Sequence, residues 1–255
     1  MQENFGAFYD WEKKREYSPR ELLAHGKTAY CPTRDELKAY AEKYREYFVY
    51  EEPLLLSPDK TIMYGYSAEG VMSLVIPDSV EIYDNLCTHS GEEEMEYDVV
   101  IGKGLKRIVE IGGAFGFHNV GFSVSNNSCF SEVDGMLYDK EEKILIAYPS
   151  GKFTGFDELA VDLEKCYIQL PMSTEKICRG AFDMLLLPMT LVIPDSVKEI
   201  EEGAFIEEYD KGLYMRERDI KARKIILPKR FEHVIDKTWK KDSYDRPDIM
   251  YYESR

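Results

Sequence analysis

The chain has 255 residues, of which 44% are hydrophobic, 13% aromatic and 32% charged. A chain of this length can bury a sizeable core, and its share of hydrophobic and aromatic residues excludes an intrinsically disordered chain. The formal net charge of −15 at pH 7 disfavours contact with nucleic acid or an anionic membrane, and it favours solubility or a basic partner.

Two capping boxes predict two helices within residues 1–52. Ser18-Pro19-Arg20-Glu21 and Thr33-Arg34-Asp35-Glu36 each place an N-cap hydroxyl three residues before a carboxylate, and the first has proline at the first helical position. We expect an N-terminal helical cap that shields the first turn of the repeats that follow. The alternative is a helix pair that binds a separate partner. The second helix gathers apolar residues on one face, namely Leu37, Tyr40, Ala41, Tyr44 and Phe48.

Residues 53–241 contain a repeated motif. The heptapeptide Leu-Val-Ile-Pro-Asp-Ser-Val occurs at residues 74–80 and again at 191–197. The interval from Pro171 to Pro194 is 23 residues, which lies in the range of one leucine-rich repeat. A third copy begins at Ile168, and two weaker copies that begin at Val99 and Ile225 bring the motif to five occurrences.

Each copy has the chemistry of one strand and one corner. Leu191 and Ile193 point to the same face of a strand, and Pro194 ends that strand because it lacks a backbone donor. The best copies continue into Gly-Ala-Phe, in which the small residues let the backbone turn while phenylalanine fills the interior. One such strand cannot bury its apolar face alone, so we expect the copies to stack into a short curved β-solenoid of the α+β class.

A second repeat predicts two inserted β-hairpins. Residues 54–66 align with residues 136–148 at a constant offset of 82, and in each segment two short apolar runs flank a polar turn. The turns are Ser57-Pro58-Asp59-Lys60 and Asp139-Lys140-Glu141-Glu142, and their residue types favour reversal of the chain.

These motifs resemble the BspA-type leucine-rich repeat family. The segment 191–205, Leu-Val-Ile-Pro-Asp-Ser-Val-x-x-Ile-x-x-Gly-Ala-Phe, is similar to the repeat signature of that family, and the hairpin from Val133 to Pro149 is similar to a segment common in it. The resemblance runs from about Leu54 to about Ile235. It implies a curved solenoid that binds ligands, often on bacterial surfaces, without shared catalytic residues.

The chain becomes basic toward its C-terminus. Between Lys211 and Lys241, eleven lysines and arginines oppose four acidic residues, which gives a net charge of +7. We expect these cations to pair with neighbouring acidic turns, because the strongly acidic remainder of the chain makes nucleic-acid binding unfavourable. Residues 242–255 form a C-terminal tail that we expect to be mobile, with Tyr251 and Tyr252 able to dock on the last turn.

No pattern of reactive residues predicts catalysis. Gly102-Lys103-Gly104 lacks the spacing of a phosphate-binding loop and follows a predicted strand at a solenoid corner. The four histidines form no His-x-x-x-His pair and the five cysteines form no Cys-x-x-Cys pair, so we expect no metal site, disulfide framework or cofactor. Cys87 and His89 could meet as a dyad, but no third group is indicated to orient them. We therefore predict a protein that is not an enzyme.

The outward positions of the five strands offer a candidate contact surface. Because side chains alternate along a strand, residues beside the inward positions face solvent. In four of the five strands, the residue just before the last inward residue is β-branched and apolar. This pattern predicts a ladder, that is, a row of such side chains that crosses the sheet from strand to strand. Such residues also suit any exposed strand without a partner, so that alternative stays open. The candidate partner-binding residues are Val75, Tyr97, Val100, Tyr167, Gln169, Thr190, Val192 and Ile226.

These features predict a non-catalytic, protein-binding scaffold inside a bacterial cell: an inhibitor, an immunity factor or an adaptor, whose partner is another protein of basic character. The first residues contain no basic region followed by an apolar stretch, and no run of roughly eighteen apolar residues occurs. We therefore expect a cytoplasmic protein that contacts no membrane. The alternative is a cell-surface adhesin or ligand-binding domain of the BspA type, whose export signal is not in the printed sequence.

Overall fold

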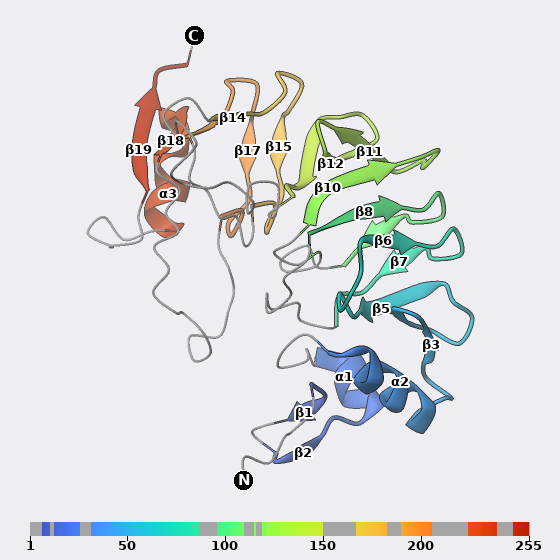
Figure 1. Cartoon of the computed structure of the whole chain (residues 1–255). Helices are drawn as coiled ribbons and strands as arrows, with labels where there is room; N and C mark the ends of the chain where they lie inside the picture. The colour runs from blue at the N-terminus through green and yellow to red at the C-terminus, as the bar shows by residue number, and fades with distance from the viewer. Residues whose placement is uncertain are drawn as a thin grey trace.

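The chain forms a curved β-solenoid with short helices toward both ends (Figure 1). This architecture confirms the solenoid predicted from the repeated motif. The computed structural model describes residues 7–10, 13–25, 32–86, 96–109, 115, 119–149, 167–182, 190–205, 224–238 and 247–254.

One side of the solenoid carries two parallel sheets. All five strands predicted from the repeats are present, and β10 and β19 add one further strand to each sheet. Residues 248–252 therefore form a strand, where the sequence predicted a mobile tail. The first sheet has the order β10 (Asn119–Val124), β8 (Tyr97–Ile101) and β6 (Ser73–Ile76). The second has the order β14 (Tyr167–Gln169), β16 (Thr190–Val192), β18 (Lys224–Pro228) and β19 (Asp248–Tyr252).

The other side carries two mixed sheets of identical topology. In each, three antiparallel strands containing the predicted hairpin are continued by two short parallel strands. The first sheet has the order β3 (Val49–Glu51), β4 (Leu54–Leu56), β5 (Ile62–Tyr66), β7 (Ile82–Tyr83) and β9 (Arg107–Ile108). The second has the order β11 (Phe130–Val133), β12 (Met136–Asp139), β13 (Ile144–Ala147), β15 (Lys176–Ile177) and β17 (Glu199–Ile200). We name β3 to β10 the N-terminal module and β11 to β19 the C-terminal module.

The two hairpin turns repeat the same chemistry at the offset of 82 residues. The Ser57 hydroxyl accepts a hydrogen bond from the backbone N–H of Ile62 at 2.9 Å, and the Asp139 carboxylate accepts one from Ile144 at 2.7 Å. Each turn contains one left-handed residue at the equivalent place: Lys60 has φ 60° and Glu142 has φ 57°. The two turns therefore share a polar side chain that accepts a hydrogen bond from a backbone N–H on the other side of the turn.

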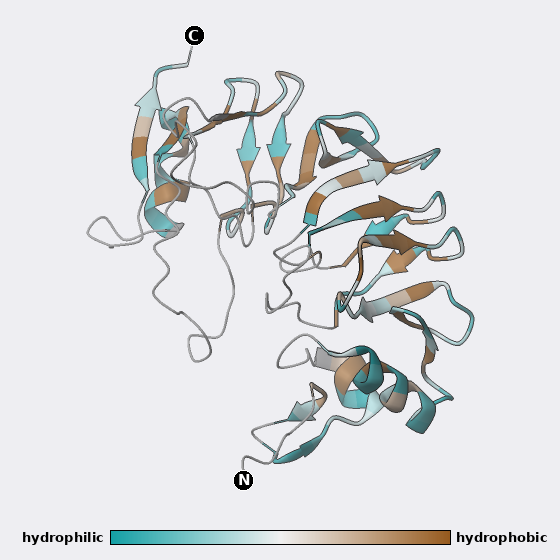
Figure 2. Ribbon diagram, viewed as in Figure 1, coloured by the Kyte–Doolittle hydropathy of each residue, from teal (hydrophilic) through white to brown (hydrophobic). Residues whose placement is uncertain are grey.

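The hairpins separate three hydrophobic clusters. In β4, Leu54 and Leu56 pack into the core of the N-terminal module, whereas Leu55 packs on the opposite face against the N-terminal helices. In β12, Leu137 likewise packs into the core of the N-terminal module while its neighbours Met136 and Tyr138 pack into the core of the C-terminal module. The N-terminal helices thus pack on the outer face of β4, and the N-terminal module packs on the corresponding face of β12. Figure 2 shows hydrophobic and hydrophilic residues interspersed along the strands, as this packing requires.

The N-terminal unit contains both predicted helices and a short hairpin. Thr33 forms a complete capping box with Glu36, and Ser18 donates its hydroxyl to Glu21 at 2.7 Å. The Phe8 ring stacks on the Tyr40 ring with centroids 3.9 Å apart, in the cluster that covers Leu55. The elements are β1 (Tyr9–Asp10), β2 (Arg15–Glu16), α1 (Pro19–His25) and α2 (Arg34–Lys43).

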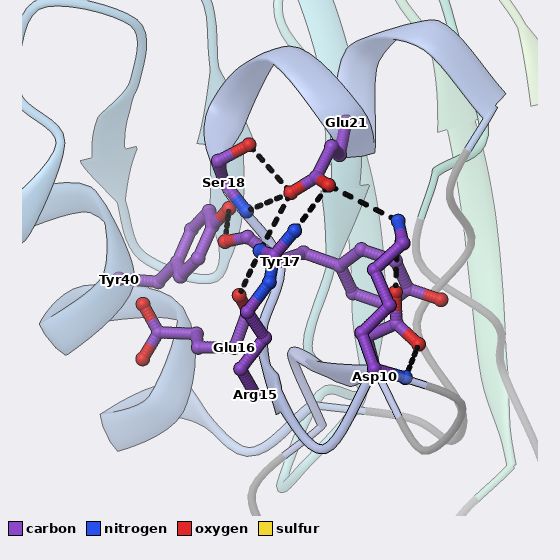
Figure 3. A network of polar contacts seen from close by, with 8 residues as sticks. Asp10, Arg15, Glu16, Tyr17, Ser18, Glu21 and Tyr40 are labelled. Atoms are coloured by element: carbon purple, nitrogen blue, oxygen red, sulfur yellow. Dashed lines mark hydrogen bonds and ion pairs between the residues drawn. The ribbon is translucent and has the colours of Figure 1, made fainter.

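Glu21 is the centre of a polar network that ties α1 to the β1–β2 hairpin (Figure 3). Its carboxylate accepts hydrogen bonds from Arg15 at 2.8 Å, from the Ser18 N–H at 3.1 Å and from Lys13 at 3.0 Å. The guanidinium of Arg15, the Ser18 groups and the Lys13 ammonium hold the pKa of Glu21 well below its usual range. Glu21 therefore stays ionised throughout the neutral range.

The C-terminal core ends on α3 (Glu232–Thr238) and the preceding 3-10 turn Lys229–Phe231. Phe231, Val234 and Ile235 belong to the same buried cluster as Leu191 and Ile225. None of the helices in the described ranges is long and apolar enough to cross a membrane.

Alkaline pH is expected to destabilise the C-terminal module through Tyr138. Its buried hydroxyl lies 2.9 Å from the Thr174 hydroxyl, and burial raises the pKa of Tyr138 to about 12. Unfolded tyrosine ionises near pH 10, so the stability that this group contributes is complete below about pH 10 and lost as pH rises toward about 12. The expected loss is about 3 kcal/mol at most.

Urea unfolding at about pH 8 and about pH 11.5 measures this loss. Tyr138→Phe removes the ionisable group, so its free energy of unfolding should fall less between the two pH values than that of the unmodified chain. An equal fall in both proteins would show that Tyr138 does not contribute.

Candidate functional site

The outward residues of the two parallel sheets form two rows, which the register of the strands defines. In the N-terminal sheet, Val75 pairs with Val100, which pairs with Ser123. We call these three residues the N-terminal row. The C-terminal row crosses four strands in register and consists of Gln169, Val192, Ile226 and Met250.

Both rows reach solvent. The side chain of Val75 is 52% exposed and that of Met250 is 48% exposed. Val192 and Ile226 are half-buried, because their neighbours across the strands cover part of each β-branched side chain. The predicted alternation is therefore correct for these positions, and three adjacent apolar side chains meet solvent on the C-terminal sheet.

A polar row runs beside the C-terminal row. In this row, Thr190 pairs with Lys224, and Lys224 pairs with Asp248. Each of the three lies two residues before a member of the C-terminal row on the same strand. The backbone of Tyr167 pairs with Thr190, while the side chain of Tyr167 lies outside the described part of the structure. The surface thus combines an apolar strip with a cation, an anion and a hydroxyl.

Tyr97 does not belong to this surface, so its assignment as a contact residue was wrong. Its side chain is 1% exposed, and its hydroxyl donates to the carbonyl of Phe115 at 2.5 Å and lies 2.7 Å from the Tyr66 hydroxyl. The physical reason is that β8 begins at Tyr97, so alternation from the inward Val99 turns Tyr97 inward as well.

The single ladder across five strands is also wrong. The rows lie on separate sheets, because β10 follows β8 in the first sheet and the second hairpin follows β10 before β14 begins. Sequence reasoning missed Ser123 and Met250, which are the members contributed by β10 and β19. Neither strand carries the proline of the repeat motif, but the continuous run of apolar and aromatic residues at 249–252 was a usable signal.

The segment Gly102-Lys103-Gly104 is a packing corner between two solenoid turns. A Cβ atom on Gly104 would lie 2.0 Å from the carbonyl oxygen of Asp78, and one on Gly102 would lie 2.3 Å from that of Ile76. The Lys103 N–H donates to the Asp78 carboxylate at 3.0 Å, and the Lys103 ammonium pairs with the same carboxylate at 2.5 Å. The two glycines therefore permit close backbone approach, in agreement with the structural interpretation of this segment.

Two basic residues of the C-terminal region that the structure describes pair with acidic turns. Arg230 contacts Asp195 at 2.7 Å, and Lys237 contacts Glu202 at 3.2 Å. Both pairs support internal neutralisation of the basic stretch. Residues 211–223, which carry several of its cations, lie outside the described ranges.

Reactive side chains are dispersed among the described residues. No group of three or more His, Cys, Asp or Glu residues there could hold a metal ion. Cys178 is a free thiol whose pKa is raised to about 11 by burial, so it is protonated at neutral pH. The proposed dyad of Cys87 and His89 lies outside the described residues.

Comparison with known proteins found two similar solved structures. No family model matches the chain, and no curated protein does. A leucine-rich repeat protein from Eubacterium ventriosum is 15% identical, with a TM-score of 0.37 over 64% of this chain and 50% of that protein. The pneumococcal vaccine antigen PcpA is 14% identical, with a TM-score of 0.29 over 71% of this chain and 68% of that one. This chain spans half the length of the first of these proteins. The solenoid assignment rests on the strand pairing described above.

Proposed function

We propose that the chain is a non-catalytic, protein-binding scaffold that holds its partner on the C-terminal row. The observation that supports this proposal is the run of Val192, Ile226 and Met250, three apolar side chains in register on solvent-facing strands. The adjacent polar row supplies hydrogen-bonding groups at its border, as protein interfaces require. The net charge of −15 favours a partner with basic character.

The double variant Val192→Lys/Ile226→Lys is expected to weaken partner binding at least about tenfold, because it places two charges in the centre of the apolar strip. The partner is first captured from native extract with the unmodified chain and identified, and its affinity is then measured by calorimetry. Val109→Lys is the matched control, since Val109 is also an exposed valine, at 50%, but lies outside both rows. Retention of full affinity by the double variant, or loss of affinity in the control, would contradict the proposed surface.

We further propose that the two N-terminal helices close one end of the solenoid. Support comes from Leu55, which is fully buried beneath the cluster that contains Leu37 and Phe48. Without these helices, the face of β4 that carries Leu55 would meet water.

An intracellular inhibitor, immunity factor or adaptor is the role that we propose, with an origin in bacteria. The alternative is a surface adhesin or ligand-binding domain like the BspA-type proteins that the repeats resemble. Cell fractionation with an antibody against the chain separates the two: recovery in the cytosolic fraction supports the first role, and recovery in the cell-wall fraction supports the second.

A further inference from the structure

A carboxylate beside the N-terminal row has no partner within the fold. Strands β8 and β10 lie side by side in the N-terminal sheet (Figure 1), and Asp98 lies on β8 two residues before Val100. The Asp98 side chain is exposed, and among the described residues its carboxylate makes no hydrogen bond and no ion pair. At the neighbouring corner, by contrast, the Asp78 carboxylate pairs with Lys103. The charge of Asp98 is therefore available to another molecule.

A β-bulge in β10 places a glycine beside this carboxylate. The register of β10 on β8 shifts between Asn119 and Gly121, so Gly121 pairs with Asp98 and Val120 is the extra residue. The buried side chain of Asn119 accepts a hydrogen bond from the Gly121 N–H at 3.0 Å, which stabilises the bulge. In regular pairing Val120 would lie beside Asp98, and its branched side chain would cover part of the carboxylate.

The fold itself does not require glycine at position 121. Gly121 does not have a positive φ, and a Cβ there would meet a single described atom within 4 Å, an oxygen of the Asp98 carboxylate at 3.3 Å. Gly102 and Gly104 differ, because a Cβ on either would lie 2.3 Å or less from backbone carbonyl oxygens. Glycine at position 121 therefore leaves open the space over Asp98, as glycines do where another molecule approaches a strand.

The neighbours of Asp98 suit an arginine side chain. Ser73 pairs with Asp98 on the side away from β10, and its exposed hydroxyl is a further acceptor. Val75 is 52% exposed and Val100 is half-buried, so the adjacent N-terminal row offers apolar surface to the methylene groups of such a side chain. A guanidinium can donate two parallel hydrogen bonds to one carboxylate. The net charge of −15 also attracts cationic groups.

We propose that the N-terminal row is a second docking surface, on which the Asp98 carboxylate binds an arginine side chain of the protein partner. This proposal rests on the protein-binding role proposed above and adds the chemistry of one contact. The arginine is flanked by apolar residues of the partner. Its guanidinium pairs with Asp98 in the space that Gly121 leaves open, and its apolar neighbours pack on Val75 and Val100.

Titration of the isotope-labelled full chain with the peptide acetyl-Leu-Arg-Leu-amide tests the site by nuclear magnetic resonance. The peptide is expected to shift the amide resonances of Asp98 and Gly121 with a dissociation constant of about 1 mM. Asp98→Asn keeps the shape of the side chain and removes its charge, so it should raise this constant at least about threefold. Gly121→Ala places a methyl group against the carboxylate and should also raise it at least about threefold.

Asp248→Asn is the matched control. Asp248 is also an exposed aspartate beside an apolar row, but its neighbour on the adjacent strand is Lys224 instead of a glycine. The two variants lose the same charge, so a general attraction of cationic peptide would weaken equally in both. The Asp248→Asn variant should bind the peptide within about 1.5-fold of the unmodified chain. A peptide with citrulline, the uncharged analogue of arginine, should cause no shifts at Asp98.

Equal weakening by Asp98→Asn and Asp248→Asn, or equal binding of the arginine and citrulline peptides, would refute the arginine site. Shifts at Asp98 caused by calcium chloride but not by the arginine peptide would also overturn it. The Val192→Lys/Ile226→Lys variant should still bind the peptide at Asp98 while it loses the protein partner. Failure of the arginine site and failure of the proposed function therefore give different results.

Discussion

Gly104→Ala is expected to lower the free energy of unfolding by about 3 kcal/mol. The added Cβ would lie 2.0 Å from the carbonyl oxygen of Asp78 and 3.1 Å from that of Val80, which are backbone atoms of the adjacent solenoid turn. Backbone at this distance cannot move aside as the end of a side chain can, so the two turns must separate. Separation would also disturb the pairing of Lys103 with Asp78.

Gly121→Ala provides the matched control. The nearest atom to a Cβ on Gly121 is a carboxylate oxygen of Asp98 at 3.3 Å, which belongs to an exposed side chain that can rotate. Its effect on stability should stay within about 1 kcal/mol. Urea unfolding followed by circular dichroism compares the two variants, and equal losses would show that close approach of the turns is not what Gly104 provides.

The pattern of the sequence predicted those parts of the fold that local chemistry determines. The corner at Pro194, the paired hairpin turns at Ser57 and Asp139, and the capping box at Thr33 each depend on residues within about five positions of one another. All of them appear in the structure as expected. The same reasoning separated inward Leu191 from outward Val192, because alternation follows from the geometry of a single strand.

The pairing of strands that lie far apart in the sequence was harder to predict. β10 and β19 match no consensus position, and they are strands because a preceding strand offers them an edge. The second hairpin separates the two parallel sheets, an effect that no single repeat contains. Tyr97 illustrates a smaller error: the strand extends two residues before the motif at Val99, and alternation carried to its true beginning would have placed the tyrosine in the core.

The pair Leu191→Ala and Val192→Ala tests the link between packing and function at adjacent positions of one strand. Leu191 is fully buried in the C-terminal cluster, so its truncation should cost about 3 to 4 kcal/mol and lower the melting temperature by roughly 10 °C. Val192 is half-buried on the outward row, and its truncation should cost under about 1 kcal/mol.

Partner affinity is expected to change in the opposite order. Measured at a temperature where both variants are folded, Leu191→Ala should bind with the affinity of the unmodified chain, while Val192→Ala should bind several-fold more weakly. Thermal unfolding and calorimetry measure the two effects separately. If Leu191→Ala reduced affinity more than Val192→Ala, partner binding would depend on the packing of the solenoid core, and the C-terminal row would not be the contact surface.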